Sequence, residues 1–77
     1  MRSVHTPAYK AFLKRLLAAR EKAGLTQGEA AHHLGVPQSR LSRMESGERR
    51  IDVIELADLA RLYGKPVSYF VPREEKN

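Results

Sequence analysis

Hydrophobic side chains recur every three or four positions along most of the chain, which is the spacing of one face of an α-helix. In residues 7–23 this stripe consists of Tyr9, Phe12, Leu13, Leu16 and Leu17. Shorter segments with the same helical spacing follow along the rest of the chain. The pattern predicts five helices, at residues 7–23, 27–34, 38–46, 52–63 and 66–70. We therefore expect an all-α fold.

Capping residues mark the ends of the predicted helices. Thr26 is followed three positions later by Glu29, a capping box that starts a helix near Gln27. A glycine tolerates the left-handed conformation that often ends a helix, and one follows each of the first four helices, at Gly24, Gly35, Gly47 and Gly64. Prolines suited to the first positions of a helix stand at Pro7, Pro37 and Pro66.

The chain is long enough for one domain with one small core. We place this domain at residues 7–71, between polar tails at residues 1–6 and 72–77. No apolar run of about 18 residues is present to span a membrane, and the N-terminus lacks the apolar stretch of a signal peptide. Because the chain also has no cysteine, we expect a cytoplasmic protein without disulfides or cysteine-bound zinc.

No pattern in the sequence is typical of an enzyme or of a cofactor site. His32 and His33 are neighbours on a predicted helix, so their side chains diverge by about 100° and cannot share one metal ion. There is no nucleotide-binding glycine loop and no nucleophile with a base beside it. We expect a binding protein without catalytic activity, metal or cofactor.

Residues 26–47 carry the most informative pattern, two short helices joined by a turn of about three residues. Ala31 is small enough to let the two helices cross closely, as in a helix-turn-helix motif. Leu41 and Met44 give the second helix a buried side. The polar side chains fall mostly on its other side, at Gln38, Ser39, Arg40, Ser42 and Arg43.

In this region the chain resembles the helix-turn-helix domain of the phage repressor and Cro type, the Xre family. The resemblance is specific over residues 19–50 and looser over residues 51–70. The matching positions are Thr26, Gln27, Ala31, Leu34, Gly35, Val36, Gln38, Ser39, Leu41, Ser42, Arg43, Glu45 and Gly47. The family implies a compact five-helix domain of the lambda-repressor type, usually dimeric, whose third helix enters the major groove of double-stranded DNA.

Two positions depart from the family pattern. Gly28 replaces the usual long polar residue. Pro37 replaces a serine or threonine that often caps the third helix, residues 38–46, which we call the reading helix. Both departures affect how Gln27 and Gln38 are aimed.

Residues at the start of the reading helix are the expected base contacts: Gln38, Ser39, Arg40 and Arg43. Glutamine can pair with adenine and arginine with guanine. The expected contacts to the DNA backbone are Gln27, Ser42, Arg49 and Arg50. The net charge of +5 divides into +4 over residues 1–35, +2 over residues 36–50 and −1 over residues 51–77, as expected for phosphate contact near the motif. The alternative for each residue alone is a solvated polar side chain.

Arg20 and Glu45 both fall at the edge of an apolar stripe, and a charge turned partly inward needs a partner. Family members pair an arginine of the first helix with a glutamate at the end of the third. We therefore expect an ion pair between Arg20 and Glu45. The alternative is two unrelated surface charges.

Apolar residues wrap most of the predicted fourth helix, although one small core requires only a single stripe. This surplus suggests a twofold dimer interface within residues 52–71. The expected interface residues are Ile54, Leu62, Val67, Tyr69 and Phe70. The alternative is that all of them fill the core of one chain.

These observations favour a sequence-specific, double-stranded DNA-binding transcriptional regulator, a homodimer that reads a near-palindromic operator. The alternative is an antitoxin or interaction module of the same fold, which binds a partner protein through its last two helices.

Overall fold

The computed structural model describes residues 6–72, and every regular element in that range is a helix. The helices are α1 (Pro7–Lys22), α2 (Gln27–Leu34), α3 (Gln38–Ser46), α4 (Val53–Tyr63) and α5 (Val67–Phe70). The expected all-α fold of five helices is therefore confirmed. Most of the two predicted tails, residues 1–5 and 73–77, lies outside the described residues.

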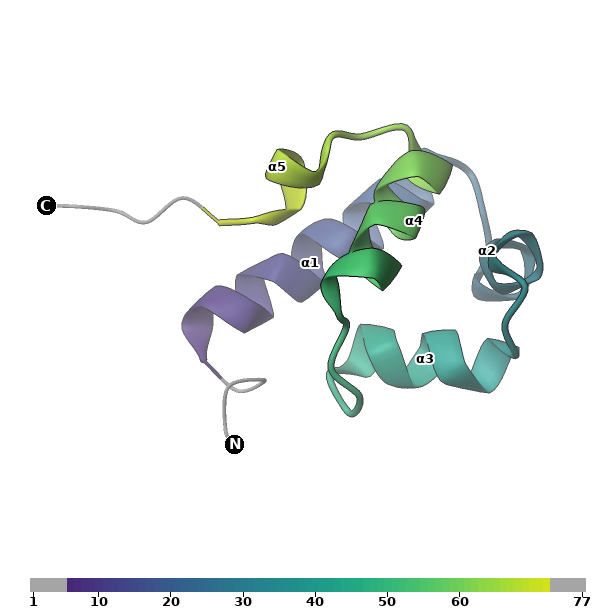
Figure 1. The fold of residues 1–77 in the computed structure, drawn as a ribbon, viewed down its shortest axis with the longest axis horizontal. Helices are drawn as coiled ribbons and strands as arrows, with labels where there is room; N and C mark the ends of the chain where they lie inside the picture. The colour runs from purple at the N-terminus through teal and green to yellow at the C-terminus, as the bar shows by residue number, and fades with distance from the viewer. Residues whose placement is uncertain (1–5, 73–77) are drawn as a thin grey trace, which may run out of the picture.

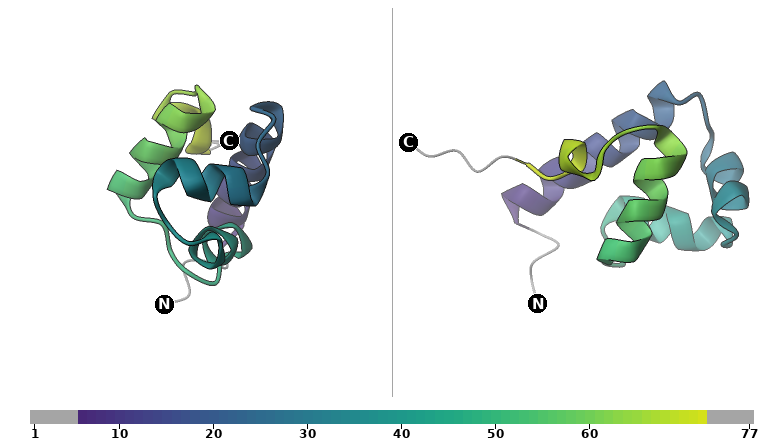
Figure 2. Two further views of the ribbon diagram at one scale, coloured as in Figure 1. Left: turned by 90° about the vertical axis from the view of Figure 1, so that its right-hand side faces the viewer. Right: turned by 45° about the horizontal axis from the view of Figure 1, so that its top comes forward.

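The helices surround one core. α1 is the longest, and α3 lies along the lower edge of the molecule in Figure 1. α3 packs against α1 and α2, and α4 packs against α1, α2 and α5. The four largest fully buried side chains come from four different helices: Leu16, Leu41, Leu59 and Phe70. α2 contributes the small side chains of Ala30 and Ala31, which let it cross α3 closely (Figure 2, left).

Capping interactions fix where α2 and α4 begin. Thr26 Oγ1 accepts from Glu29 N–H at 3.1 Å, and Glu29 Oε1 accepts from Thr26 N–H at 2.9 Å. Asp52 and Glu55 form the same reciprocal pair at the start of α4. By contrast, Pro37 precedes α3 without any side-chain cap. Each helix therefore starts within one residue of its predicted position.

Gly47 ends α3 in the left-handed region, with φ of 87°. A Cβ at this position would lie 3.1 Å from Leu13 Cδ1, so the turn lies directly on α1. Glycine is required here both for the backbone conformation and for this close approach.

Phe70 belongs to the core of the single chain. α5 is a single turn that lies against α1 and α4 (Figure 2, right), and this packing buries the Phe70 ring completely. The expectation that Phe70 contributes to a dimer interface was wrong, because its side chain has no exposed surface.

The surplus apolar surface of α4 is confined to its first turn. Leu59, Ala60 and Tyr63 are buried, whereas Val53 is 71% exposed and Ile54 is 67% exposed. The alternative that these apolar residues fill the core of one chain thus holds for the C-terminal half of α4 but not for its first turn. None of the described helices has the length and apolar character needed to cross a lipid bilayer.

Candidate nucleic-acid interface

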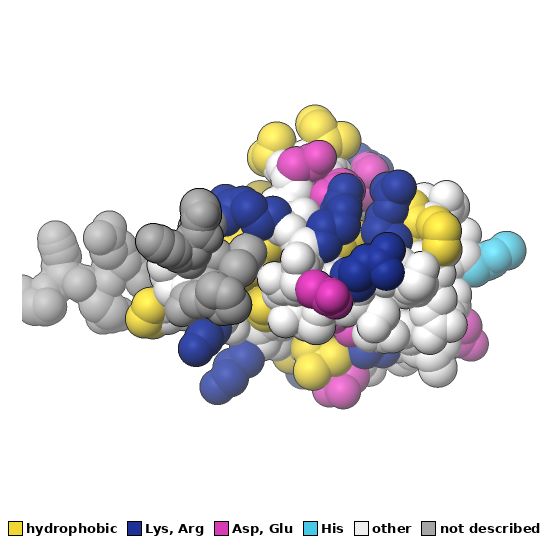
Figure 3. Space-filling view, turned by 90° about the horizontal axis from the view of Figure 1, so that it is seen from below, with side chains coloured by type: hydrophobic (Ala, Val, Ile, Leu, Met, Phe, Trp, Pro, Cys, Tyr) yellow, Lys and Arg dark blue, Asp and Glu magenta, His cyan; other side chains and the backbone are white. Residues whose placement is uncertain are grey.

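α3 has one buried and one open side. Leu41 and Met44 point into the core, with 0% and 3% of their surface exposed. The opposite side, which we call the outer face of α3, consists of the exposed residues Gln38, Ser39, Arg40, Ser42 and Arg43. Viewed from the side on which α3 lies, the molecule carries a group of Lys and Arg side chains near the middle of this surface (Figure 3).

Polar side chains of the outer face have few partners within the described part of the protein. Within residues 6–72, those of Gln38, Ser39 and Arg43 make no hydrogen bond or ion pair. Arg20 and Arg49, by contrast, are both paired with glutamates. The donors and acceptors of the outer face are therefore available to an external ligand.

Arg40 lies at one flank of the outer face. It lines a hollow between α3 and α4 together with Glu55 and Asp58. Its positive charge adds to the influences that lower the pKa of Glu55, of which the hydrogen bond from Arg49 is the largest. Arg40 therefore lies nearer to acidic groups of α4 than sequence reasoning indicated.

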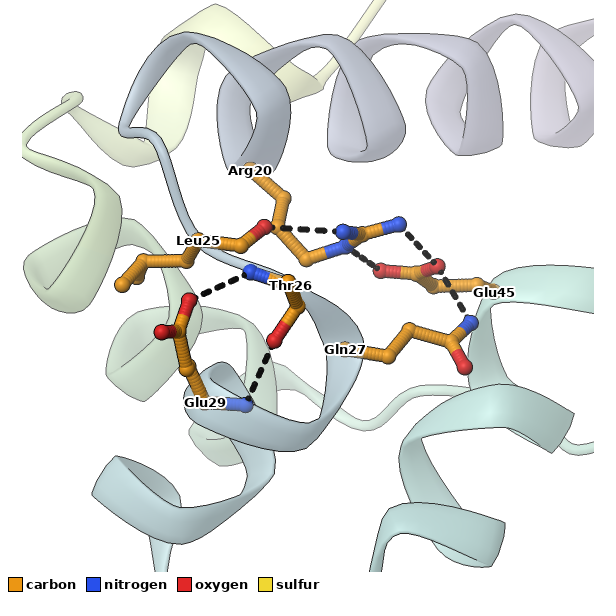
Figure 4. A network of polar contacts seen from close by, with 6 residues as sticks. All are labelled: Arg20, Leu25, Thr26, Gln27, Glu29 and Glu45. Carbon is orange, nitrogen blue, oxygen red and sulfur yellow. Dashed lines mark hydrogen bonds and ion pairs between the residues drawn. The ribbon is translucent and has the colours of Figure 1, made fainter.

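A bidentate ion pair holds the end of α3 to α1 (Figure 4). Arg20 Nε lies 2.7 Å from Glu45 Oε2, and Arg20 Nη2 lies 3.1 Å from Glu45 Oε1. The third donor, Arg20 Nη1, reaches the carbonyl oxygen of Leu25 at 2.9 Å. The two side chains are 12% and 8% exposed, and the hydrogen bond to Glu45 raises the pKa of Arg20. The pair expected from the sequence is thus present, in a nearly buried setting.

Gln27 joins this network, which its position in the sequence did not indicate. Its Nε2 donates to Glu45 Oε1 at 2.8 Å (Figure 4), so the side chain turns toward α3 and is half-buried. The partner that turns it lies 18 residues further along the chain, so no local pattern in the sequence indicates this contact. Glu45 therefore accepts hydrogen bonds from two other helices.

Tyr63 is a buried polar group beside the same ion pair. Its hydroxyl has no hydrogen-bond partner among the described residues. Burial, reinforced by the nearby Glu45 carboxylate, raises the pKa of Tyr63 to about 12. The phenol is therefore neutral under ordinary conditions.

The segment after α3 carries Arg49 and Arg50 and is attached to two helices. Arg49 Nη1 lies 3.0 Å from Glu55 Oε2 on α4, while the Arg50 guanidinium lies 5.6 Å from the centre of the Tyr9 ring on α1. Tyr9 Oη also accepts a hydrogen bond from Ile51 N–H at 3.1 Å. Tyr9 was expected only as part of an apolar stripe, and its anchoring of this segment was missed because the tyrosine lies 42 residues away in the sequence.

The expected interface residues other than Phe70 are distributed over α4 and α5. Ile54 and Val67 are exposed, and Leu62 and Tyr69 are half-buried. The Tyr69 ring lies 4.9 Å from the Lys65 ammonium group, and its backbone carbonyl accepts from Arg15 of α1. The two exposed residues are thus the most accessible members of the set.

The chain belongs to the helix-turn-helix family of the XRE type. The helix-turn-helix family matches residues 16–70, which include all of α2, α3, α4 and α5. This is a family of DNA-binding regulators and not a class of enzymes.

Two similar proteins support this assignment. An XRE-family like protein from Pseudomonas syringae pv. tomato has a solved structure with a TM-score of 0.80 and 45% identity, over 90% of this chain and 84% of that one. The HTH-type transcriptional regulator ImmR of Bacillus subtilis is 40% identical over 62 residues. That match covers 80% of this chain and 49% of the regulator, so the chain spans about half the length of that relative.

Proposed function

We propose that this chain binds double-stranded DNA in a sequence-specific manner and thereby regulates transcription, with α3 in the major groove. The supporting observation is the outer face of α3, whose polar side chains are exposed while the helix behind them is fastened by a nearly buried ion pair. A rigid helix with unoccupied donors and acceptors is what direct readout of base edges requires. The similarity to a protein named as a transcriptional regulator favours the same function. We infer a cytoplasmic location for such a protein.

Each residue of the interface has a chemical role in this proposal. Gln38 supplies paired hydrogen bonds to an adenine, and Arg43 supplies a bidentate contact to a guanine. The remaining base contacts are Ser39 and Arg40. The contacts to phosphates are Gln27, Ser42, Arg49 and Arg50, of which Gln27 binds through the amide groups at the start of α2.

The active form in this proposal is a homodimer. Ile54 and Val67 are apolar side chains left exposed by the fold, and a twofold contact through them would remove them from water. Leu62 and Tyr69 lie beside them as half-buried members of the same region. A dimer of this kind reads a near-palindromic operator with two half-sites about 34 Å apart.

A second candidate function rests on the same exposed side chains. Val53 and Ile54 at the start of α4 could instead bind a different protein, as in an antitoxin or interaction module. Such a module needs no base selectivity.

Selection of bound sequences from random DNA, followed by a salt titration of the preferred site, tests the two candidates. Arg43→Ala should relax preference at one base pair in each half-site, at roughly 1 to 3 kcal/mol. Arg49→Ala should weaken binding to all sequences about equally and flatten the salt dependence. Selection of no common sequence, or an Arg43→Ala profile identical to that of the wild type, would contradict the DNA-reading proposal and favour the interaction module.

A further inference from the structure

Gly28 differs from the other glycines of the described chain because its backbone conformation does not require glycine. Positive φ angles occur at Gly24, Gly35, Gly47 and Gly64 but not at Gly28, which is the second residue of α2. Glycine within a helix is less favourable than alanine. The backbone therefore gives no reason for a glycine at position 28, and the space beside it shows what a larger residue would meet there.

That space is occupied by Gln38. A Cβ built on Gly28 would lie 3.4 Å from Gln38 Oε1 and 3.9 Å from Gln38 Cδ. The same Cβ would lie 3.9 Å from Thr26 Oγ1, which is engaged in the capping box. The amide end of Gln38 thus lies against the bare backbone at the start of α2, where a longer residue at position 28 would compete with it.

We propose that Gly28 is a positioning residue for DNA recognition, because the absence of a long side chain at this position leaves the Gln38 amide in its place against α2. This inference rests on the proposed function, in which Gln38 contacts a base. A bidentate contact to adenine requires the amide in one orientation, and glutamine has several rotatable bonds that can misdirect it. A side chain that already rests against α2 loses less conformational freedom on binding DNA.

Two substitutions at position 28 separate this role from an effect on folding. Gly28→Gln introduces the long polar side chain that competes with Gln38. Gly28→Ala introduces only a methyl group at ordinary contact distance, so it should preserve base preference while raising the Tm through better helix propensity. Ala8→Gln is the matched control, since Ala8 is the exposed second residue of α1.

The experiment is selection of bound sequences and affinity measurement for wild type, these variants, Gln38→Ala and the double variant Gly28→Gln with Gln38→Ala. We expect Gly28→Gln to reduce discrimination by roughly five- to 100-fold at the same base pair that Gln38→Ala affects. The double variant should show no further loss there, and Ala8→Gln should retain the wild-type profile.

The outcomes distinguish this proposal from the proposed function. If Gln38→Ala alters one base pair but Gly28→Gln leaves it unchanged, the role of Gly28 is overturned while base reading by Gln38 stands. If Gln38→Ala alters nothing, Gln38 reads no base and both proposals fail for this residue. In the free wild-type protein, 15N relaxation should also show restricted motion of the Gln38 side-chain amide, and free motion there would overturn the role of Gly28 even if Gly28→Gln does not fold.

Discussion

Glu45 is the residue on which the attachment of α3 depends most directly. Its carboxylate accepts hydrogen bonds from Arg20 Nε, Arg20 Nη2 and Gln27 Nε2, and it is nearly buried. Loss of one member of a buried pair leaves the other charge without compensation, which costs more than the intact pair contributes.

Glu45→Ala should therefore lower the free energy of unfolding by roughly 3 to 5 kcal/mol, equivalent to more than about 10 °C in Tm. Chemical denaturation monitored by circular dichroism measures this. The matched control is Asp58→Ala, which removes a pair with Arg61 whose side chains are 51% and 75% exposed, and which should change stability by less than about 1 kcal/mol. Equal effects of the two substitutions would show that the nearly buried pair has no special role.

Tyr63 makes stability depend on alkaline pH. The pKa of its phenol is about 12 in the folded protein and about 10 in an unfolded chain. Between these values only the unfolded state loses the proton, so the contribution of Tyr63 to stability is complete below pH of about 10 and is lost as pH rises toward 12.

Tyr63→Phe should reduce this alkaline loss by about 1 to 2 kcal/mol, and it should not destabilise the protein at neutral pH because it removes a buried hydroxyl without a partner. Urea denaturation of both proteins at a series of pH values from 8 to 12 gives the comparison. Parallel pH profiles for Tyr63→Phe and wild type would contradict the assignment.

Residue-level prediction from the sequence succeeded where a local pattern and a family pattern agreed. The pair of Arg20 with Glu45 could be expected because each lies beside an apolar stripe. The contacts of Gln27 with Glu45 and of Tyr9 with Ile51 could not, since each joins residues brought together only by packing of helices.

At the level of elements, α2 and α4 have complete capping boxes whereas α3 has none. The position of α3 therefore depends on its neighbours more than on its own first turn. α2 in particular precedes α3 by a short turn and packs on it closely.

Thr26→Ala should consequently destabilise the protein by about 1 kcal/mol, because Glu29 N–H loses its acceptor. Thermal unfolding measures the change as a decrease of roughly 4 to 8 °C in Tm. Ser68→Ala, at an exposed position of α5, is the control and should stay within about 0.5 kcal/mol of the wild type. A Thr26→Ala variant as stable as this control would mean that the capping box does not determine where α2 begins.

The helix boundaries could be predicted closely because the chain encodes them in local signals, such as Thr26 before α2 and Gly64 after α4. The packing of α5 could not be predicted from the sequence. Whether Phe70 faces a second chain or the core of its own depends on the direction in which the loop after α4 returns, which no local periodicity specifies.

At the scale of the whole molecule, the proposed base contacts lie on α3, whereas the exposed apolar side chains proposed for association lie on α4 and α5. Ile54 retains 67% of its surface in the single chain. Insertion of a charge there should have little effect on folding and a large effect on association, if that surface is an interface.

Ile54→Glu should therefore shift the protein from dimer to a monomer of 8.7 kDa in sedimentation at micromolar concentration, with its Tm at low concentration unchanged. Ala18→Glu adds the same charge at an exposed position of α1 and should leave association intact. A wild-type protein that sediments only as a monomer at these concentrations would exclude the proposed dimer.

The hydrogen bond from Ile51 N–H to Tyr9 Oη holds the segment after α3 against α1. Together with the Arg20–Glu45 pair, it fastens α1 to both sides of the turn at Gly47. The spacing between α3 and the two arginines that follow it is thus already established before any encounter. Amide exchange at Ile51 should therefore be equally slow with and without DNA. Recognition would then be the docking of a preformed surface, without folding of this segment around the ligand.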